Sequence, residues 1–586
     1  GLLVILVATV VIVWAASTSA NLNVSATVIR NCTISTAAVG FGSYDPITAN
    51  ATANLDAAGT VTVACTKGTT ATIGLDLGQN ASLMPRLTVK GPAGAFVTII
   101  PAELLKPSGE LDDTMCGGRS YWSYTLAGTG TETYFPKFFY RGARYLKVEC
   151  TGGAEVTALE GIVVHSSAPP VGGFSCSNDL FNRIRTLVRW AQRSNLMSVI
   201  TDCPHREKLG WLEQYHLNGP SLRYEFDLAT LFTKGMNDMA DSQLENGLAP
   251  DIAPEYVKFS GGFRDSPEWG SAVVLVPWQQ YEFTGDVALL RRYYDSMQQY
   301  VAYLGSQAKG HIVDHGLGDW YDIGPKHPSE AQLTPKALTA TAIYYEDVTV
   351  LARTARLLGR EDDARRYDEL AGEIRAAFQT RFPDLPDSQT GRAMPLVVGL
   401  VEPSARPAVL DALVNDVRQK GLTAGDVGYR YLLRALADDG RSDVVFAMNN
   451  QSDNPGYGYQ LRQGATSLTE AWDSRRSSSQ NHFMLGQIIE WFYHDLAGIQ
   501  PGQPGFKHVI IKPAIVGDLT WVKCSYGSPY GRIVSNWTRD GNKLTMDVTI
   551  PANTTATVHV PGKDGGDREV GPGHHQFRST LVPSVR

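Results

Sequence analysis

The sequence has few cysteines, and none of them stands in a C-x-x-C pair. The seven thiols are scattered over 586 residues. Because zinc sites are built from closely spaced thiolates and imidazoles, this scatter argues against a zinc site, and we expect no bound metal. Cys32 and Cys65 lie in strand-like segments, and we predict that they form a disulfide in an oxidising compartment. We expect most of the others to be buried, unreactive thiols.

Long basic runs are also missing. The sequence has 52 Lys and Arg residues against 59 Asp and Glu residues, which gives a formal net charge of −7 at pH 7. Because a nucleic-acid surface needs clustered positive charge, this balance argues against a nucleic-acid partner. The hydrophobic share of 43% and the charged share of 19% are those of an ordinary globular protein, neither disordered nor fibrous.

The apolar segment at the start of the chain is short for a membrane-spanning helix. Residues 1–16 are almost wholly apolar, whereas a span needs about 20 such residues. Thr18, Ser19 and Ala20 then supply small residues of the kind that signal peptidase accepts. This pattern is typical of a secretory signal peptide. We therefore expect residues 1–20 to be removed, no stable membrane span to remain, and the protein to be secreted or periplasmic.

The chain is too long for one hydrophobic core, and its length favours about three to four domains. Residues 21–75 alternate polar and apolar positions, which indicates strands. Residues 76–170 hold further strand-like pieces separated by Gly and Pro, so we predict an accessory β-sandwich there. Pro169-Pro170 marks its end. The last residues, 501–586, return to strands and predict a second, C-terminal β-sandwich.

Residues 171–500 show helical periodicity broken by loops rich in Gly, Pro and aromatic residues. Apolar side chains repeat every three to four residues between 180 and 191, and again between 289 and 301. Paired helices with polar, aromatic loops predict a toroid of helical hairpins, an (α/α) barrel with its pocket at one end. We expect further helices at 339–358, 361–381, 405–419 and 481–497.

One polar segment of the helical region combines acids, an arginine and an indole. It runs from Asp202 to Trp211 and includes Arg206 and Glu207. An arginine beside a carboxylate can hold that carboxylate's orientation, and a tryptophan offers a flat face for a sugar ring. Glu470, two residues before another indole, is a second carboxylate close to a tryptophan in the sequence. Two acids held apart across a pocket are the minimal machinery for hydrolysing a glycosidic bond.

Three short motifs mark the first strands: Asn31-Cys32-Thr33-Ile34, Phe41-Gly42-Ser43-Tyr44-Asp45-Pro46 and Val63-Ala64-Cys65-Thr66. They closely resemble the spore coat protein U family of secreted, pilin-like subunits. The resemblance covers residues 21–75, roughly the front half of such a domain. It implies a partial Ig-like β segment, which should be poorly stable alone because an Ig-like sandwich needs about seven strands.

The rest of the chain carries four motifs: the segment Asp202–Trp211, then Gly318-Asp319-Trp320, then Gly464-Ala465-Thr466 leading to Glu470, then Asn481-His482. Together they resemble glycoside hydrolase family 78, the α-L-rhamnosidases, over residues 76–586. The resemblance implies an (α/α)6 barrel at 171–500 as the catalytic domain, flanked by β-sandwich domains. It also implies inverting hydrolysis of terminal α-L-rhamnosyl residues from a polysaccharide or glycoside, without a cofactor.

The resemblance assigns roles residue by residue. Glu207 matches the general acid, and Glu470 matches the general base that activates water. The acid must stay protonated at working pH, which burial beside Trp211 would favour by raising its pKa. The sugar contacts that the resemblance implies are Asp202, Arg206, Trp211, Trp269, Asp319, Trp320 and His482.

Two departures from the family pattern bear on the substrate. The family usually has a Gly-Asp pair shortly after the Gly-Trp, and here Leu212-Glu213-Gln214 stands instead. Gln214 occupies the place of a sugar-binding aspartate and offers no ionised acceptor, with Glu213 as a neighbouring substitute. The loop between Glu470 and His482 is also much shorter than in many members, which should reshape the pocket rim.

Other interpretations stay open. The structural alternatives are a surface ion pair for Arg206 and Glu207, core packing for Trp269 and Trp320, a turn for Asp319 and a helix start for His482. A polysaccharide lyase on a related barrel would release rhamnose by β-elimination from a uronic acid, with an arginine neutralising the uronate. A non-enzymatic pilus or coat component would use the barrel as a binding module, which the presence of both glutamates argues against. The sequence does not indicate the oligomeric state, the aglycone or the linkage.

Overall fold

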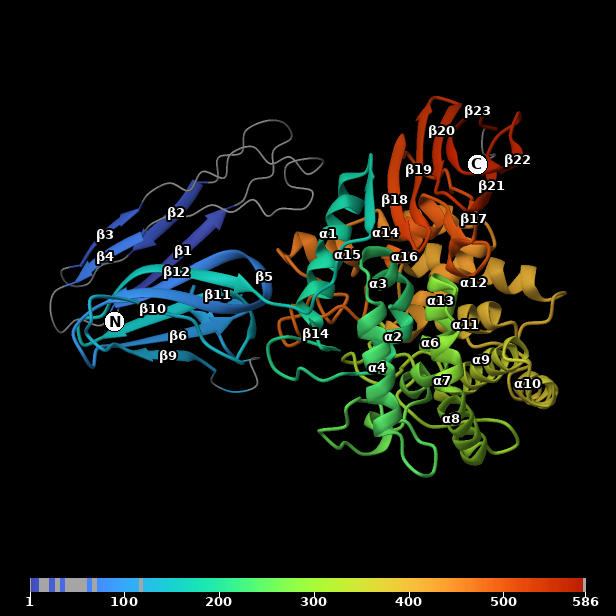
Figure 1. The fold of residues 1–586 in the computed structure, drawn as a ribbon, viewed down its shortest axis with the longest axis horizontal. Coiled ribbons are helices and arrows are strands. Elements are labelled where there is room, and N and C mark those ends of the chain that lie inside the picture. The colour runs from blue at the N-terminus through green and yellow to red at the C-terminus, as the bar shows by residue number, and fades with distance from the viewer. Residues whose placement is uncertain are drawn as a thin grey trace.

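The computed structural model describes residues 74–114, 118 and 120–582 in full, and the backbone alone of residues 2–9, 21–26, 32–36, 61–65 and 71–73. Figure 1 shows a β-rich N-terminal part beside a helical body, with the C-terminal strands packed on that body. The expected multidomain architecture, a helical domain flanked by β-rich domains, is confirmed.

The N-terminal part centres on one long strand. Its main sheet contains β1 (Leu2–Thr9), β2 (Asn21–Ala26), β5 (Ala71–Lys90), β6 (Phe96–Ala102), β9 (Trp122–Thr125), β10 (Thr131–Tyr134), β11 (Arg141–Thr151) and β12 (Glu155–Val163). β5 pairs with β1 and β11 along its first half and with β10 and β12 along its second half. Alternation explains why this segment is a strand: Leu87 and Val89 are buried, whereas Arg86 and Lys90 are exposed.

The expected boundary between residues 75 and 76 falls inside β5, which continues through it without a break. Two short pairs lie outside the main sheet: β3 (Cys32–Thr36) with β4 (Val61–Cys65), and β7 (Leu104–Leu105) with β8 (Leu111–Asp112). The backbone places Cys32 opposite Cys65. Their side chains lie outside the described residues, so the disulfide stays a prediction, as does the signal peptide over residues 1–20.

The helical body follows. Its α-helices are α1 (Asp179–Asn195), α2 (Glu213–Leu217), α3 (Gly219–Glu225), α4 (Ala229–Ser242), α5 (Pro267–Gly270), α6 (Ala272–Thr284), α7 (Ala288–Arg292), α8 (Tyr294–Gln307), α9 (Lys336–Leu357), α10 (Glu361–Arg381), α11 (Gln389–Val398), α12 (Arg406–Lys420), α13 (Asp426–Asp438), α14 (Ser442–Asn449), α15 (Tyr457–Arg462) and α16 (Ile488–Trp491). A π-helical turn, Phe492–Leu496, continues α16, and a short hairpin of β14 (Leu196–Met197) and β15 (Val199–Ile200) follows α1. No helix in the described part of the chain is both long and apolar enough to cross a bilayer.

Three of the four further helices predicted from the sequence are confirmed by α9, α10 and α12. The prediction at 481–497 is wrong in its first half, since α16 begins only at Ile488. There the backbone N–H of His482 donates to the carbonyl of Leu468, so this stretch bonds to a distant loop rather than to itself. The periodic stretch at 289–301 is likewise divided, because Tyr293 leaves the helical region with φ −106° and ψ 13°.

The C-terminal domain consists of two sheets. One contains β13 (Gly172–Cys176), β18 (Trp521–Ser528), β19 (Gly531–Asp540), β20 (Lys543–Ile550) and β23 (Gly573–Thr580); the other contains β16 (Ile499–Pro501), β17 (His508–Ile511), β21 (Thr555–Val560) and β22 (Gly566–Val570). β13 precedes the helical body in sequence and pairs antiparallel with β18 after it. A glycine is needed at position 172 for β13 to run this close to α3, because a Cβ there would lie 2.0 Å from the carbonyl oxygen of Tyr224.

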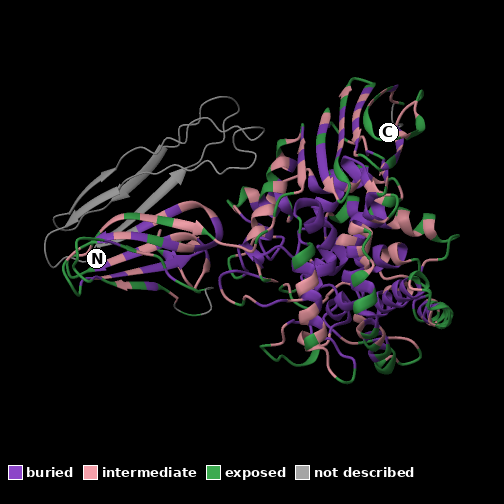
Figure 2. Cartoon of the chain, viewed as in Figure 1, coloured by how far each residue is buried: buried purple, intermediate pink, exposed green. Residues whose placement is uncertain are grey.

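The apolar cores of the described residues are separate. One cluster of buried side chains runs continuously from Phe174 in β13 to Val560 in β21, through the helical body and the C-terminal sheets. The N-terminal part has its own cluster, which includes Leu87, Trp122 and Leu146. Figure 2 shows buried residues concentrated inside the helical body and alternating with less buried residues along the strands. The N-terminal part therefore has an apolar core distinct from that of the helical body.

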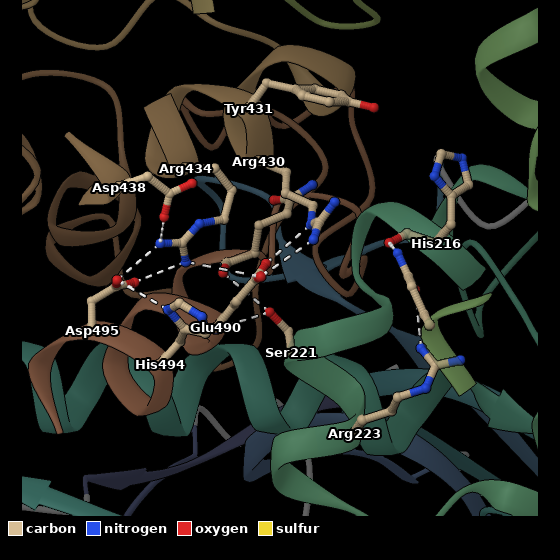
Figure 3. A network of polar contacts seen from close by, with 12 residues as sticks. His216, Ser221, Arg223, Arg430, Tyr431, Arg434, Asp438, Glu490, His494 and Asp495 are labelled. Atoms are coloured by element: carbon tan, nitrogen blue, oxygen red, sulfur yellow. Dashed lines mark hydrogen bonds and ion pairs between the residues drawn. The ribbon is translucent and has the colours of Figure 1, made fainter. Parts of the chain in front are cut away.

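A buried ion-pair network joins α13 to the end of the helical body (Figure 3). Arg434 donates to both carboxylate oxygens of Asp495 at 2.8 and 2.9 Å, and Arg430 donates to Glu490 at 3.0 and 3.3 Å. Burial alone would raise the pKa of Asp495, but Arg434 and His494 lower it well below its ordinary value. Each buried carboxylate of this network is paired with an arginine, so its charge is tolerated only while that arginine is present.

Replacing Arg434 by alanine should therefore destabilise the fold strongly. It leaves the buried Asp495 carboxylate without its guanidinium, and we expect the free energy of unfolding to fall by about 3–5 kcal/mol. Arg365→Ala on α10 is the matched control, because its ion pair with Asp362 is exposed and should contribute no more than about 1 kcal/mol. Chemical denaturation followed by tryptophan fluorescence measures both. Equal losses in the two variants would show that the network adds no stability.

Candidate active site

The segment that carries the predicted acid is a tight loop closed by Asp202. The Asp202 carboxylate accepts a hydrogen bond from the backbone N–H of Leu209 at 2.8 Å, and the Asp202 N–H donates to the carbonyl of Leu209 at 3.0 Å. Asp202 is buried, and burial and then the nearby charge of Glu207 raise its pKa well above the ordinary value. These contacts make Asp202 an anchor of the loop that presents Glu207.

Arg206 contacts both predicted catalytic carboxylates, that of the general acid Glu207 and that of the general base Glu470. Its Nε lies 3.4 Å from Glu207 Oε1, and its Nη2 lies 3.4 Å from Glu470 Oε2. Arg206 and Glu470 are 264 residues apart in the sequence, so the fold creates this arrangement. Because both carboxylates touch the same planar guanidinium, the contacting oxygens are at most about 9 Å apart.

The two glutamates differ in exposure. The expected burial of Glu207 is wrong: its side chain is 40% exposed, because it lies in a surface turn that continues through Lys208 with φ 57°. The Glu470 side chain is only 9% exposed. Its Oε2 accepts a hydrogen bond from the backbone N–H of Ser479 at 2.8 Å, in addition to the contact with Arg206. Both contacts stabilise a charged carboxylate.

A row of aromatic rings leads from the acid segment to Glu470. Trp211 stacks on Phe259 with ring centroids 5.4 Å apart, and Phe263 meets Trp320 edge to face at 5.5 Å. Trp211 and Phe263 are 6.4 Å apart, and Trp320 lies 5.2 Å from Tyr321. Trp211 and Trp320, both predicted sugar contacts, are thus part of one partly exposed aromatic surface.

Sequence reasoning missed Tyr321, Phe259 and Phe263. Burial and then the charge of Glu470 raise the pKa of Tyr321, which places its phenol beside the predicted base. The only available signal was its position directly after Gly318-Asp319-Trp320. The two phenylalanines lie in a loop with no motif, so the sequence carried no signal for them.

For two predicted sugar contacts the structure favours the structural alternative. Trp269 is 3% exposed and belongs to the main apolar core. The buried carboxylate of Asp319 accepts hydrogen bonds from Thr390 and from the backbone N–H groups of Gly425 and Gly428. Its acceptors are therefore engaged in holding the loop that begins α13.

His482 and Gln214 are both buried, and they differ in their surroundings. Burial lowers the pKa of His482 to about 3, although the charge of Glu207 opposes this effect, so His482 is neutral and close to the acid. Gln214 lies beside Glu213, whose pKa burial raises to about 8. Burial also raises the pKa of Glu268 to about 7 and that of Asp426 well above its ordinary range. A buried carboxyl group that keeps its proton can donate as well as accept hydrogen bonds.

Glu213 predicts a specific pH dependence of stability. Between pH 4.5 and about 8 the unfolded chain has lost a proton that the folded protein keeps, so stability falls as the pH rises through this window. In Glu213→Gln this contribution is absent. From pH 5 to pH 8 we expect the free energy of unfolding of the variant to rise by up to about 4 kcal/mol relative to that of the wild type. Chemical denaturation at the two pH values checks this.

The control for that measurement is the exposed Glu369→Gln on α10, whose difference from the wild type should be the same at both pH values. A Glu213→Gln variant whose difference from the wild type also stayed constant would contradict the buried, neutral state of Glu213.

An open cavity of about 860 Å³ lies next to this aromatic surface. Phe259, which stacks on Trp211, is part of its lining, together with Arg264, Asp265 and Lys309. Its lining includes neither Glu207 nor Glu470. Within the described residues no group of three or more His, Cys, Asp or Glu side chains is arranged to hold a metal ion. Cys150, Cys176, Cys203 and Cys524 are free and buried, as expected.

The helical body brings two glutamates to one arginine, and a pair of carboxyl groups held apart in this way is the machinery of a glycoside hydrolase. The family model described as the bacterial alpha-L-rhamnosidase 6 hairpin glycosidase domain matches residues 169–496, more than half of the sequence. The chain belongs to this family. The models of the concanavalin-like and C-terminal domains of bacterial alpha-L-rhamnosidases match residues 66–165 and 498–575. A Spore Coat Protein U domain model matches residues 18–98, which confirms the resemblance of the N-terminal segment to that family.

Similar proteins are named alpha-L-rhamnosidases. An alpha-L-rhamnosidase of Streptomyces avermitilis is 33% identical over 541 residues, covering 86% of this chain and 51% of that protein. The solved alpha-L-rhamnosidase of Dictyoglumus thermophilum is 31% identical with a TM-score of 0.81, covering 86% of this chain and 62% of that one. The Streptomyces avermitilis structure complexed with L-rhamnose is 32% identical with a TM-score of 0.81, covering 86% and 52%. The chain spans about half the length of the curated relatives it matches.

Proposed function

We propose that the protein is a secreted or periplasmic, inverting, exo-acting α-L-rhamnosidase that removes terminal α-L-rhamnosyl residues from a polysaccharide or glycoside. The observation that carries the proposal is the contact of both Glu207 and Glu470 with the guanidinium of Arg206, at 3.4 Å from Nε and from Nη2. Inverting glycosidases hold their two carboxyl groups about 6.5–9.5 Å apart to admit a water. The upper limit of about 9 Å that Arg206 imposes is compatible with that spacing.

In the proposed reaction Glu207 is the general acid. It donates its proton to the glycosidic oxygen as the bond to the anomeric carbon breaks, and the aglycone leaves as an alcohol. Its exposure lets a substrate reach it.

Glu470 is the proposed general base. It removes a proton from a water molecule, and the resulting oxygen nucleophile attacks the anomeric carbon from the face opposite the leaving group. The backbone N–H of Ser479 and the guanidinium of Arg206 hold the charged carboxylate in place. The product is β-L-rhamnose, and no cofactor takes part.

The aromatic surface accounts for recognition of rhamnose. The sugar has a 6-methyl group and an apolar patch, which the partly exposed Trp211 and Trp320 can accept. His482 and Gln214 supply neutral polar groups near the acid segment. Support for the substrate class also comes from the Streptomyces avermitilis relative, which was solved in complex with L-rhamnose.

Incubation of the purified protein with 4-nitrophenyl α-L-rhamnoside, followed by proton NMR from the first minute, tests the proposal. We expect free rhamnose to appear first as the β-anomer and then to mutarotate. Initial α-rhamnose would disprove inversion. With a rhamnose-capped, uronate-containing polysaccharide, free rhamnose without an unsaturated uronate supports exo hydrolysis, whereas an unsaturated product would show lyase chemistry.

A further inference from the structure

Glu103 belongs to the β-rich N-terminal part but lies against the catalytic segments of the helical body. It follows β6 directly and precedes the short strand β7. Its side chain is 6% exposed, although it carries a carboxylate. Carboxylates are rarely buried so fully unless polar partners compensate for the lost water.

Both oxygens of Glu103 are engaged. Oε1 accepts a hydrogen bond from Asn80 Nδ2 at 2.9 Å, and Oε2 accepts one from the backbone N–H of Gln480 at 3.0 Å. His205 Nε2 lies 3.6 Å from Oε2. Asn80 is also on the N-terminal part, in β5, whereas Gln480 and His205 belong to the helical body.

The two contacts to the helical body fall next to the two proposed catalytic groups. Gln480 directly follows Ser479, whose backbone N–H holds Glu470 Oε2 at 2.8 Å. His205 directly precedes Arg206, which contacts both Glu470 and Glu207. One carboxylate therefore joins the loop of the base to the loop of the acid.

Other polar contacts from the N-terminal part support the same two loops. The backbone N–H of Gly142 donates to the carbonyl of Pro204 at 2.9 Å, and Lys208 Nζ donates to the carbonyl of Tyr140 at 2.7 Å. On the other loop, Asn80 Nδ2 donates to the carbonyl of Gln480 at 3.1 Å. Because the two parts have separate apolar cores, these polar contacts help to fix the N-terminal part on the active site.

The charges around Glu103 link it electrostatically to the site. Burial raises its pKa to about 7, the hydrogen bonds from Asn80 and Gln480 lower it, and Arg206 lowers it while Glu470 raises it. Glu103 thus interacts electrostatically with Arg206 and Glu470, two residues of the proposed catalytic site.

We propose that Glu103 is a positioning residue for catalysis, supplied by the N-terminal β-rich part, which fixes the loop of Glu470 relative to the loop of Arg206 and Glu207. The inference rests on the proposed function. It makes the N-terminal part a component of the active site rather than a separate binding module. Glu103 touches no reacting atom, and it acts through Gln480 and His205.

The test uses the full chain with Glu103→Ala and, as matched control, Glu132→Ala. Glu132 is equally buried in the N-terminal part, on β10, and accepts the backbone N–H groups of Ala127 and Gly128. It therefore reports on damage to the β-rich part alone. We expect Glu103→Ala to lower kcat about 10- to 100-fold on 4-nitrophenyl α-L-rhamnoside with KM within about threefold, because small misplacements of catalytic groups have effects of this size. Glu132→Ala should lower the melting temperature with kcat within about threefold.

A double variant separates positioning from general damage. If Glu103 acts through the placement of Glu470, Glu103→Ala should cause no further loss in a Glu470→Gln background. Losses that multiply, or a single Glu103→Ala variant with kcat within threefold of the wild type, would overturn the inference. Should Glu103→Ala fail to fold, Glu103→Gln keeps the side-chain volume and one accepted hydrogen bond, and we expect a loss of about three- to tenfold.

Hydrogen exchange read by mass spectrometry makes the outcome independent of turnover. Peptides covering 470–482 and 202–208 should exchange faster in Glu103→Ala than in the wild type. In Glu132→Ala their exchange rates should equal those of the wild type. A wild-type protein that is inactive on the rhamnoside would refute the proposed function, whereas unchanged exchange in both peptides would refute the positioning role of Glu103.

Discussion

Glu470→Gln is expected to lower kcat by 10²–10⁴ on any rhamnoside, the usual effect of removing a general base or acid. Glutamine keeps the size of the side chain, and its carbonyl oxygen can still accept the hydrogen bond from Ser479. It cannot take a proton from water, and it lacks the charge that faces Arg206. The loss should therefore be chemical rather than structural, with a melting temperature close to that of the wild type. Steady-state kinetics on 4-nitrophenyl α-L-rhamnoside measures it.

The control for this variant is the exposed Glu369→Gln on α10, which should match the wild type in kcat and KM. If Glu470→Gln retained kcat within about threefold of the wild type, the water would have to be activated elsewhere. The assignment of the base would then be wrong.

Glu207→Gln should show a loss that depends on the leaving group. With a natural alcohol as aglycone the departing oxygen needs a proton, and we expect kcat/KM to fall by 10²–10⁴. With 4-nitrophenolate, which leaves readily without a proton, the loss should be at least about tenfold smaller. Comparison of the two substrates in one variant therefore separates a general acid from a residue that only binds sugar.

Equal losses on both substrates would contradict the role of Glu207 as the acid. Glu207→Gln also removes the ion pair with Arg206, but that pair is partly exposed and should contribute little to stability. A normal melting temperature would confirm that the kinetic effect is local.

The sequence was sufficient for the architecture, a helical domain flanked by β-rich domains, because strand and helix periodicities are local patterns. Periodicity predicted α9, α10 and α12 closely, since each presents an apolar stripe to a core. It failed at 481–487, where the backbone N–H of His482 bonds to Leu468. No local pattern contains information about a partner from another loop.

The same limit explains the residues of the site that were missed or misjudged. Glu103 is a single carboxylate between two strands, and only the packing of one domain on another gives it a role. Trp269 and Asp319 fit the family pattern equally well as ligands and as structural residues, and only the burial of Trp269 and the hydrogen bonds of Asp319 favour the structural role. The exposure of Glu207 likewise depends on how a turn faces solvent, which residue type does not indicate.

The pairing of β13 with β18 has a consequence for synthesis on the ribosome. Gly172 lies opposite Tyr526, so about 350 residues, including the whole helical body, separate the two strands in the chain. At about 5–20 residues per second, β13 leaves the ribosome roughly 20–70 s before its partner. Through that interval Phe174 and Cys176, which end up buried, have no strand beside them. Side chains of α1 reach this strand earlier, since Asn182 bonds to Cys176 and Arg185 to the carbonyl of Phe174. The pairing with β18 is nevertheless missing while the helical body emerges, and it is then that a chaperone would be of most use.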